Sequence, residues 1–160
     1  MERDEALEPL RRVLLERAPG GVAEAVEAAR AALAGGVDCP GLWELGVLPE
    51  GDVLEARRLL DVIAQELAPA LRLPAGRKAR EWALARYWLR DLLDGRLDPA
   101  EAAARIGFGL RLADDPGSPL WPFYLWLHRA EDQREHCGGV SAELVAELHE
   151  LAARLLAEPG

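Results

Sequence analysis

SPLWPFYLWLHRAEDQREHC, residues 118–137, carries the strongest structural signal in the chain. Its apolar residues recur every three or four positions, which is the spacing of one face of an α-helix. The first half is apolar on every side and predicts burial between other helices, whereas the charged second half predicts exposure to solvent. We therefore expect a helix that begins in the core and emerges from it near His128.

The same spacing recurs along the rest of the chain, and strand-like alternation is almost absent. Asp98 and Pro99 form a typical helix start, and Ser141 is placed to cap another helix. We expect a segment over residues 36–51 to be irregular and pinned to the body by Trp43 and Leu45. The expected helices cover residues 4–18, 22–34, 53–67, 75–94, 99–113, 119–135 and 142–157.

Length and composition bound the fold class. A chain of 160 residues, half of them hydrophobic and 29% charged, has the size and composition of one globular domain. A domain of this size buries roughly 70% of its unfolded surface and needs no metal or disulfide to fold. The sequence thus predicts an all-α, compact single-domain bundle of six to seven helices over residues 1–160, with no significant β-sheet.

The charge of the chain restricts its partners. A net charge of −9 argues against a nucleic acid or an anionic membrane as partner, because both are polyanions. Asn and Thr are absent, which leaves few of the side chains that recognise sugars or bases. Arg outnumbers Lys 18 to one, as a GC-rich bacterial genome would encode. The start of the sequence has no apolar signal region, so we expect a cytoplasmic protein with Cys39 and Cys137 as reduced thiols.

The charged half of residues 118–137 offers one candidate ligand site. His128 and Asp132 are one helical turn apart and could form an oriented His–carboxylate pair for general-base or metal chemistry. Glu135 and His136 would add two more ligands for a metal. The alternative is a histidine at the edge of the core followed by a solvated turn. The H-E-x-x-H and Glu-x-x-His patterns of known metal sites are missing, so we expect no cofactor, and the sequence does not identify a metal.

Aromatic residues concentrate in the second half of the chain, where eight of the nine Trp, Tyr and Phe residues lie between positions 82 and 126. Such a concentration is typical of a shared core. Alternatively, part of the set lines a groove for a partner helix or a flat ligand, because Trp and Arg dominate binding hot spots. The candidates for this surface are Trp82, Trp88, Trp121 and Tyr124.

A third candidate is an anion site formed by Arg77, Lys78 and Arg80 at the start of the helix over residues 75–94. The free amides and the dipole of a helix start favour an anion, as do these cations. The alternative is pairing of the cations with nearby acids.

The leading hypothesis for function is a non-catalytic protein–protein interaction module, either an adaptor or an immunity-like inhibitor, with an unidentified protein partner. Its basis is an acidic helical chain without a recognisable catalytic constellation; self-association is compatible with the sequence. The alternative is a small-ligand or metal-binding domain, conceivably an enzyme, that uses the face of His128, Asp132 and Glu135.

Overall fold

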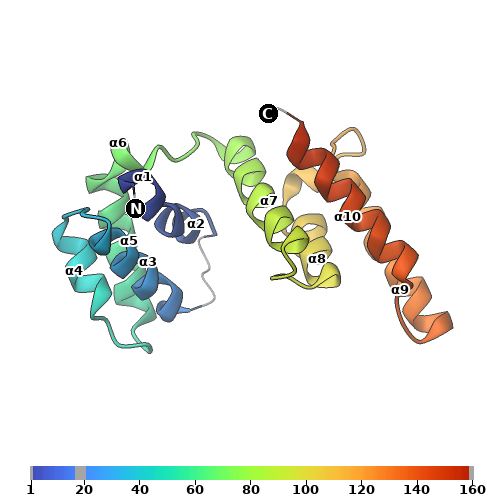
Figure 1. The fold of residues 1–160 in the computed structure, drawn as a ribbon, viewed down its shortest axis with the longest axis horizontal. Helices are drawn as coiled ribbons and strands as arrows, with labels where there is room; N and C mark the ends of the chain where they lie inside the picture. Colours follow the sequence, from blue (N-terminus) through green and yellow to red (C-terminus); the bar gives the residue numbers. More distant parts are fainter. Residues whose placement is uncertain (1, 17–20, 159–160) are drawn as a thin grey trace. The chain divides into compact units, whose positions relative to one another are not determined.

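The computed structural model describes residues 2–16 and 21–158, and every regular element in these ranges is helical (Figure 1). The all-α fold class is therefore confirmed. Eight of the described α-helices have seven or more residues, so the prediction of six to seven helices is too low. None of the helices in these ranges is long and apolar enough to cross a lipid bilayer.

The helices fall into two compact units, residues 1–75 and residues 76–160, and each unit buries a hydrophobic cluster of its own. This division describes packing, and a single domain over the whole chain stays a prediction. The first unit contains α1 (Arg3–Ala6), α2 (Glu8–Glu16), α3 (Val22–Ala34), α4 (Pro40–Gly46), α5 (Val53–Glu66) and α6 (Ala68–Leu71). The second contains α7 (Arg77–Leu93), α8 (Pro99–Gly109), the 3-10 helix η1 (Arg111–Asp114), α9 (Trp121–Cys137) and α10 (Ala142–Ala157).

The first predicted helix is in fact two helices. α1 ends before Leu7 and α2 begins at Glu8. Pro9 explains the break, because it has no N–H to donate to the carbonyl of Glu5, as a continuous helix would require. Arg11 of α2 donates hydrogen bonds to the backbone carbonyls of Ala70 and Leu71 and so links α2 to α6. The predicted end of the first helix, at residue 18, lies outside the described residues.

α4 occupies the middle of residues 36–51, so the expectation of an irregular segment is wrong there. Pro40 is the first residue of α4, a position where a missing N–H costs no hydrogen bond. Leu42 is completely buried in the core of the first unit. Gly41 lets α5 approach closely, because a Cβ there would lie 2.8 Å from Cγ1 of Ile63.

α8 and α10 begin where the sequence predicts them, whereas α7 and α9 each begin two residues later than predicted, at Arg77 and Trp121. Asp98 caps α8 by accepting two backbone N–H hydrogen bonds, at 3.0 and 3.2 Å. Ser141 caps α10, since its Oγ accepts from the N–H of Leu144 at 3.2 Å. The end of α8 differs from the prediction of residue 113: it ends at Gly109, and Leu110 is extended before η1 begins.

Candidate functional site

Three rings of α9 contact one another in a row. The rings of Trp121 and Tyr124 stack with their centroids 4.9 Å apart and their planes 28° from parallel. Tyr124 contacts the His128 ring edge-on, with the centroids 4.6 Å apart. Phe108 of α8 adds a fourth ring, whose centroid lies 6.1 Å from that of Tyr124. Two helices thus contribute to one aromatic cluster.

A glycine makes this arrangement possible. A Cβ at Gly107 would lie 3.2 Å from Cα and 3.3 Å from the backbone N of Tyr124, and 2.8 Å from Cδ1 of Leu127. α8 therefore approaches the backbone of α9 more closely than any other residue type would allow. Because Phe108 follows Gly107 directly, this close approach brings the Phe108 ring to Tyr124.

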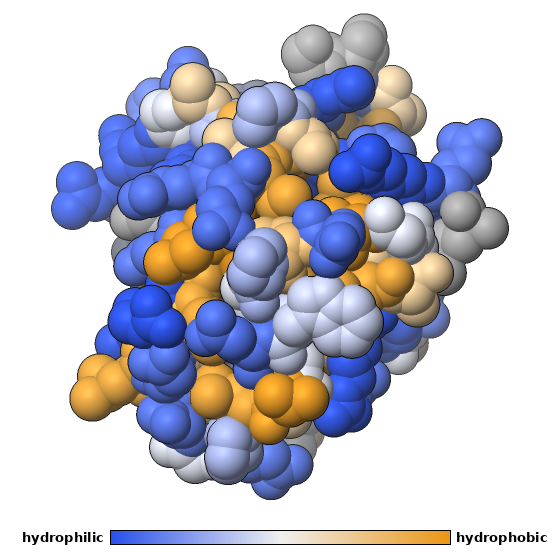
Figure 2. All heavy atoms as spheres, turned by 90° about the vertical axis from the view of Figure 1, so that its left-hand side faces the viewer, coloured by the Kyte–Doolittle hydropathy of each residue, from blue (hydrophilic) through white to orange (hydrophobic). Residues whose placement is uncertain are grey.

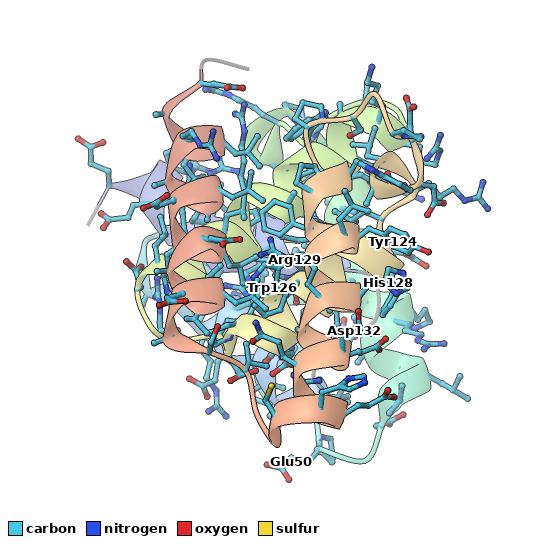
Figure 3. The ribbon with its side chains drawn as sticks, turned by 90° about the vertical axis from the view of Figure 1, so that its right-hand side faces the viewer. Glu50, Tyr124, Trp126, His128, Arg129 and Asp132 are labelled. Atoms are coloured by element: carbon cyan, nitrogen blue, oxygen red, sulfur yellow. The ribbon has the colours of Figure 1, made fainter. Side chains whose placement is uncertain are left out.

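The aromatic cluster reaches the surface. Phe108 is 60% exposed and Leu125, beside Tyr124 on α9, is 45% exposed, while Trp121 and Tyr124 are partly buried. In Figure 3, Tyr124, His128 and Asp132 follow one another along the edge of α9 that faces away from α10. Large apolar side chains gathered at a surface typically mark an interaction site.

The opposite side of α9 holds the helix in place. Trp126 and Arg129 point toward α10 (Figure 3). Nε1 of the buried Trp126 donates to the carbonyl of Leu144 at 2.7 Å. Arg129 pairs with Glu147 at 2.6 Å, and this pair holds the pKa of the Glu147 carboxyl below its usual value. α9 is therefore held by α10 on one side and by α8 at Tyr124, while His128 and Asp132 are exposed to solvent.

The charged half of the exposed side is acidic. Glu131, Asp132 and Glu135 are all exposed, and the carboxylates of Asp132 and Glu135 form no ion pair within the described parts of the chain. We call the whole surface the aromatic–acid face. Its members are Phe108, Trp121, Tyr124, Leu125, His128, Glu131, Asp132 and Glu135.

The predicted ligand set on α9 does not come together. Nδ1 of His128 lies 4.0 Å from a carboxylate oxygen of Glu131 rather than against Asp132. Nδ1 of His136 contacts the backbone carbonyl of Asp132 at 2.8 Å, which is a contact within the helix. The described residues contain no group of three or more His, Cys, Asp and Glu side chains that could hold a metal ion. Glu135 is exposed in solvent near the end of the helix.

The four predicted surface aromatics have different environments. Trp88 is only 9% exposed and belongs to the core of the second unit. Trp82 is partly buried and packs against the same core. Only Trp121 and Tyr124 contribute to the aromatic–acid face. Phe108 is absent from the predicted surface, although its position next to a helical glycine is a signal for close helix contact.

The predicted anion site has one cation already paired. Arg77 contacts Glu81 at 3.0 Å, and Glu81 also accepts from the backbone N–H of Leu112 at 2.9 Å. Lys78 is exposed, whereas Nε of Arg80 is buried with no hydrogen-bond partner in the described structure. The three cations thus have different environments, and anion binding by them stays a prediction.

Sequence analysis also missed an apolar surface in the first unit. Trp43 is 60% exposed, so the expectation that it pins residues 36–51 is wrong, although Leu45 is buried as expected. Figure 2 views the molecule from the side of the first unit and shows apolar residues at the surface between polar ones. Four exposed apolar side chains lie in α4, at the start of α5 and in the turn that joins them, and we call them the α4–α5 patch: Trp43, Val47, Val53 and Leu54.

The two thiols also differ in environment. Cys39 is buried before α4, and its thiol donates to the Glu66 carboxylate at 2.7 Å. Burial first, and the hydrogen bond to Glu66 second, raise the pKa of Cys39, which opposes formation of the reactive thiolate. Cys137 is exposed at the end of α9, and neither cysteine forms a disulfide.

Comparison with models of protein families finds no match to this chain. Comparisons with curated proteins and with solved structures find no significant match either. Any functional argument therefore depends on the surfaces of the molecule itself.

Proposed function

We propose that this protein is a non-catalytic interaction module, an adaptor or an inhibitor, that binds another protein through the aromatic–acid face. The observation that carries the proposal is the row of contacting rings from Trp121 to His128, joined by Phe108 at the surface. Trp and Tyr side chains contribute much of the energy at protein interfaces. A protein partner also fits the net charge of −9, which would repel a nucleic acid.

The rigidity of the face supports the same function. The Tyr124 ring lies between the rings of Trp121 and His128, and the Tyr124 backbone is in close contact with Gly107. Phe123 and Leu127, on the inner side of α9, are buried in the core. Side chains that are already ordered lose less conformational entropy when a partner binds. Tyr124 is thus held in place before a partner binds.

The α4–α5 patch provides the control surface. It has more exposed apolar side chains but only one aromatic residue, Trp43, whose Nε1 already donates to Asp38 at 3.0 Å. Its other members are aliphatic side chains around a turn. We therefore assign the main interaction to the aromatic–acid face.

Capture of partners from a lysate of the source organism tests this assignment. The full chain would be compared with Phe108→Ser in the aromatic–acid face and with Leu54→Ser in the α4–α5 patch. Both positions are exposed, so circular dichroism should show that both variants fold. We expect a stoichiometric partner to bind the parent and Leu54→Ser and to be lost from Phe108→Ser. Loss from Leu54→Ser alone, or equal recovery by all three proteins, would overturn the proposal.

A further inference from the structure

We propose that the docking segment of the partner is a basic amphipathic helix, which places its apolar side chains on the aromatic half of the aromatic–acid face and its Lys or Arg side chains on the acidic half. This inference rests on the proposed function and specifies the chemistry of the partner. It follows from the shape of the face, from its unpaired charges and from the weakness of the other candidate occupants.

The face forms a straight stripe along α9. At about 100° per residue, its seven α9 members lie within about 60° of the direction of His128. The two arginines of α9, Arg129 and Arg134, fall about 100° and 120° from that direction, so they lie outside the stripe. From Trp121 to Glu135 the stripe extends about 21 Å at 1.5 Å per residue. A partner helix of about fifteen residues would cover it.

The charges of the stripe favour cations. Asp132 and Glu135 have no ion-pair partner in the described chain, and Glu131 has only the 4.0 Å contact with His128. By contrast, Glu101 on α8 is already paired with Arg105, at 2.5 Å. The carboxylates of the stripe are therefore available to Lys or Arg of a partner. The faces of Trp and Tyr rings also attract cations, which extends the preference into the aromatic half.

The apolar side chains require more than a cation. Phe108 and Leu125 remain substantially exposed in the free protein, and covering them would contribute about 25 cal/mol per Å² of buried apolar area. A flexible polycation would satisfy the carboxylates but would leave these side chains in water. An amphipathic helix satisfies both halves, because it can present apolar and basic residues along one side.

A second copy of this chain fits the stripe poorly. Parallel pairing of two α9 helices would bring the acidic halves together, and like charges repel. Antiparallel pairing would place Asp132 and Glu135 of one copy against the apolar rings of the other, with no Lys or Arg in either stripe to pair with them. A nucleic acid or an anionic membrane would be repelled by the same carboxylates.

Titration of synthetic peptides against the full chain tests this inference. The probe is a fluorescent helical peptide of about eighteen residues, with Leu at helical spacing and Lys elsewhere. One matched peptide replaces every Lys with Glu, and another replaces every Leu with Ser. The protein variants are Asp132→Asn with Glu135→Gln, Phe108→Ser, and a charge-matched control on α10, Glu143→Gln with Glu150→Gln. Fluorescence anisotropy gives each Kd at low and high salt.

We expect only the Leu–Lys peptide to bind well. The Asp132→Asn, Glu135→Gln variant should weaken binding at least about tenfold and remove most of its salt dependence. Phe108→Ser should weaken it at least about fivefold, and the α10 control should match the parent. Sedimentation of the parent alone should show no self-association that Phe108→Ser removes.

Each other outcome overturns a defined part of the argument. If Phe108→Ser weakens binding but the Asp132→Asn, Glu135→Gln variant does not, the partner is not basic although the aromatic–acid face is still the interaction site. If neither variant changes the Kd, the inference fails and this face loses its proposed function as well. If the peptide with Ser in place of Leu binds as tightly as the Leu–Lys peptide, net charge alone explains the binding and the amphipathic helix is overturned as the occupant. A dimer that Phe108→Ser abolishes would make a second copy the occupant.

Discussion

A Cβ atom at Gly107 of α8 would lie only 3.2 Å from Cα of Tyr124 on α9. This distance is shorter than ordinary van der Waals contact between carbons, so the two helices approach as closely as a glycine permits. The same contact positions the exposed ring of Phe108 against Tyr124. The packing of the second unit and the geometry of the aromatic–acid face thus depend on one missing side chain.

Gly107→Ala should therefore destabilise the protein. Alanine favours a helix over glycine by about 1 kcal/mol, but overpacking a close contact costs typically 1–3 kcal/mol. We expect a net loss of about 1 kcal/mol in the free energy of unfolding, measured by urea titration with circular dichroism.

Gly109→Ala is the matched control, because nothing lies within 4 Å of a Cβ at that position. It should leave stability unchanged or raise it by a few tenths of a kcal/mol, since Gly109 is the last residue of α8. A Gly107→Ala protein as stable as Gly109→Ala would show that α8 and α9 are not in close contact.

Arg11 should contribute far more to stability than Arg58. The Arg11 side chain is 13% exposed, and its guanidinium donates to the carbonyls of Leu71 at 2.8 Å and Ala70 at 3.2 Å. Arg11→Met would leave these acceptors without donors and should cost about 2–3 kcal/mol. Arg58 is 57% exposed and pairs mainly with Glu55, so Arg58→Met should cost less than about 1 kcal/mol. Equal losses on urea unfolding would contradict this ranking.

The parts of the fold that the sequence predicted correctly depend on local interactions. A capping side chain bonds to N–H groups two or three residues away, so Asp98 and Ser141 could be recognised without knowledge of the tertiary structure. α4 could not be recognised in this way. An isolated helix of seven residues is unstable, and α4 persists because Leu42 is buried and Gly41 packs against Ile63 of α5.

In the candidate site, too, the contacts within one helix could be predicted from the sequence, whereas the exposure of each side chain could not. Helical spacing placed Trp121, Tyr124 and His128 on one face, and their ring contacts confirm it. The exposure of a side chain cannot be predicted in this way, because it depends on how the helices pack against one another. Trp88 is buried together with Ala85, Leu89 and Leu92 of the same helix, and Phe108 joins the face only through the contact between α8 and α9.

Trp126 and Trp43 illustrate this difference in a form that can be measured. Trp126→Phe would remove the indole hydrogen bond to the Leu144 carbonyl and part of a buried ring, and should lower the free energy of unfolding by about 1–3 kcal/mol. Trp43→Phe removes only an exposed hydrogen bond to Asp38 and should stay within about 0.5 kcal/mol of the parent. Thermal and urea unfolding of the two variants would settle the comparison, and a larger loss for Trp43→Phe would reverse our assignment of core and surface.

Cys39 should make the protein less stable at alkaline pH. Its pKa is raised in the folded state by burial and by the Glu66 carboxylate, so the folded protein retains a proton that the unfolded chain releases above about pH 9. The contribution of the thiol is therefore complete below that pH and decreases as the pH rises toward the folded-state value. Urea unfolding between pH 8 and about pH 10 should show this decrease in the parent and a shallower one in Cys39→Ala. Cys137→Ala should retain the slope of the parent because Cys137 is exposed. If Cys39→Ala kept the full slope as well, the alkaline loss would come from other groups and the buried thiol would have no part in it.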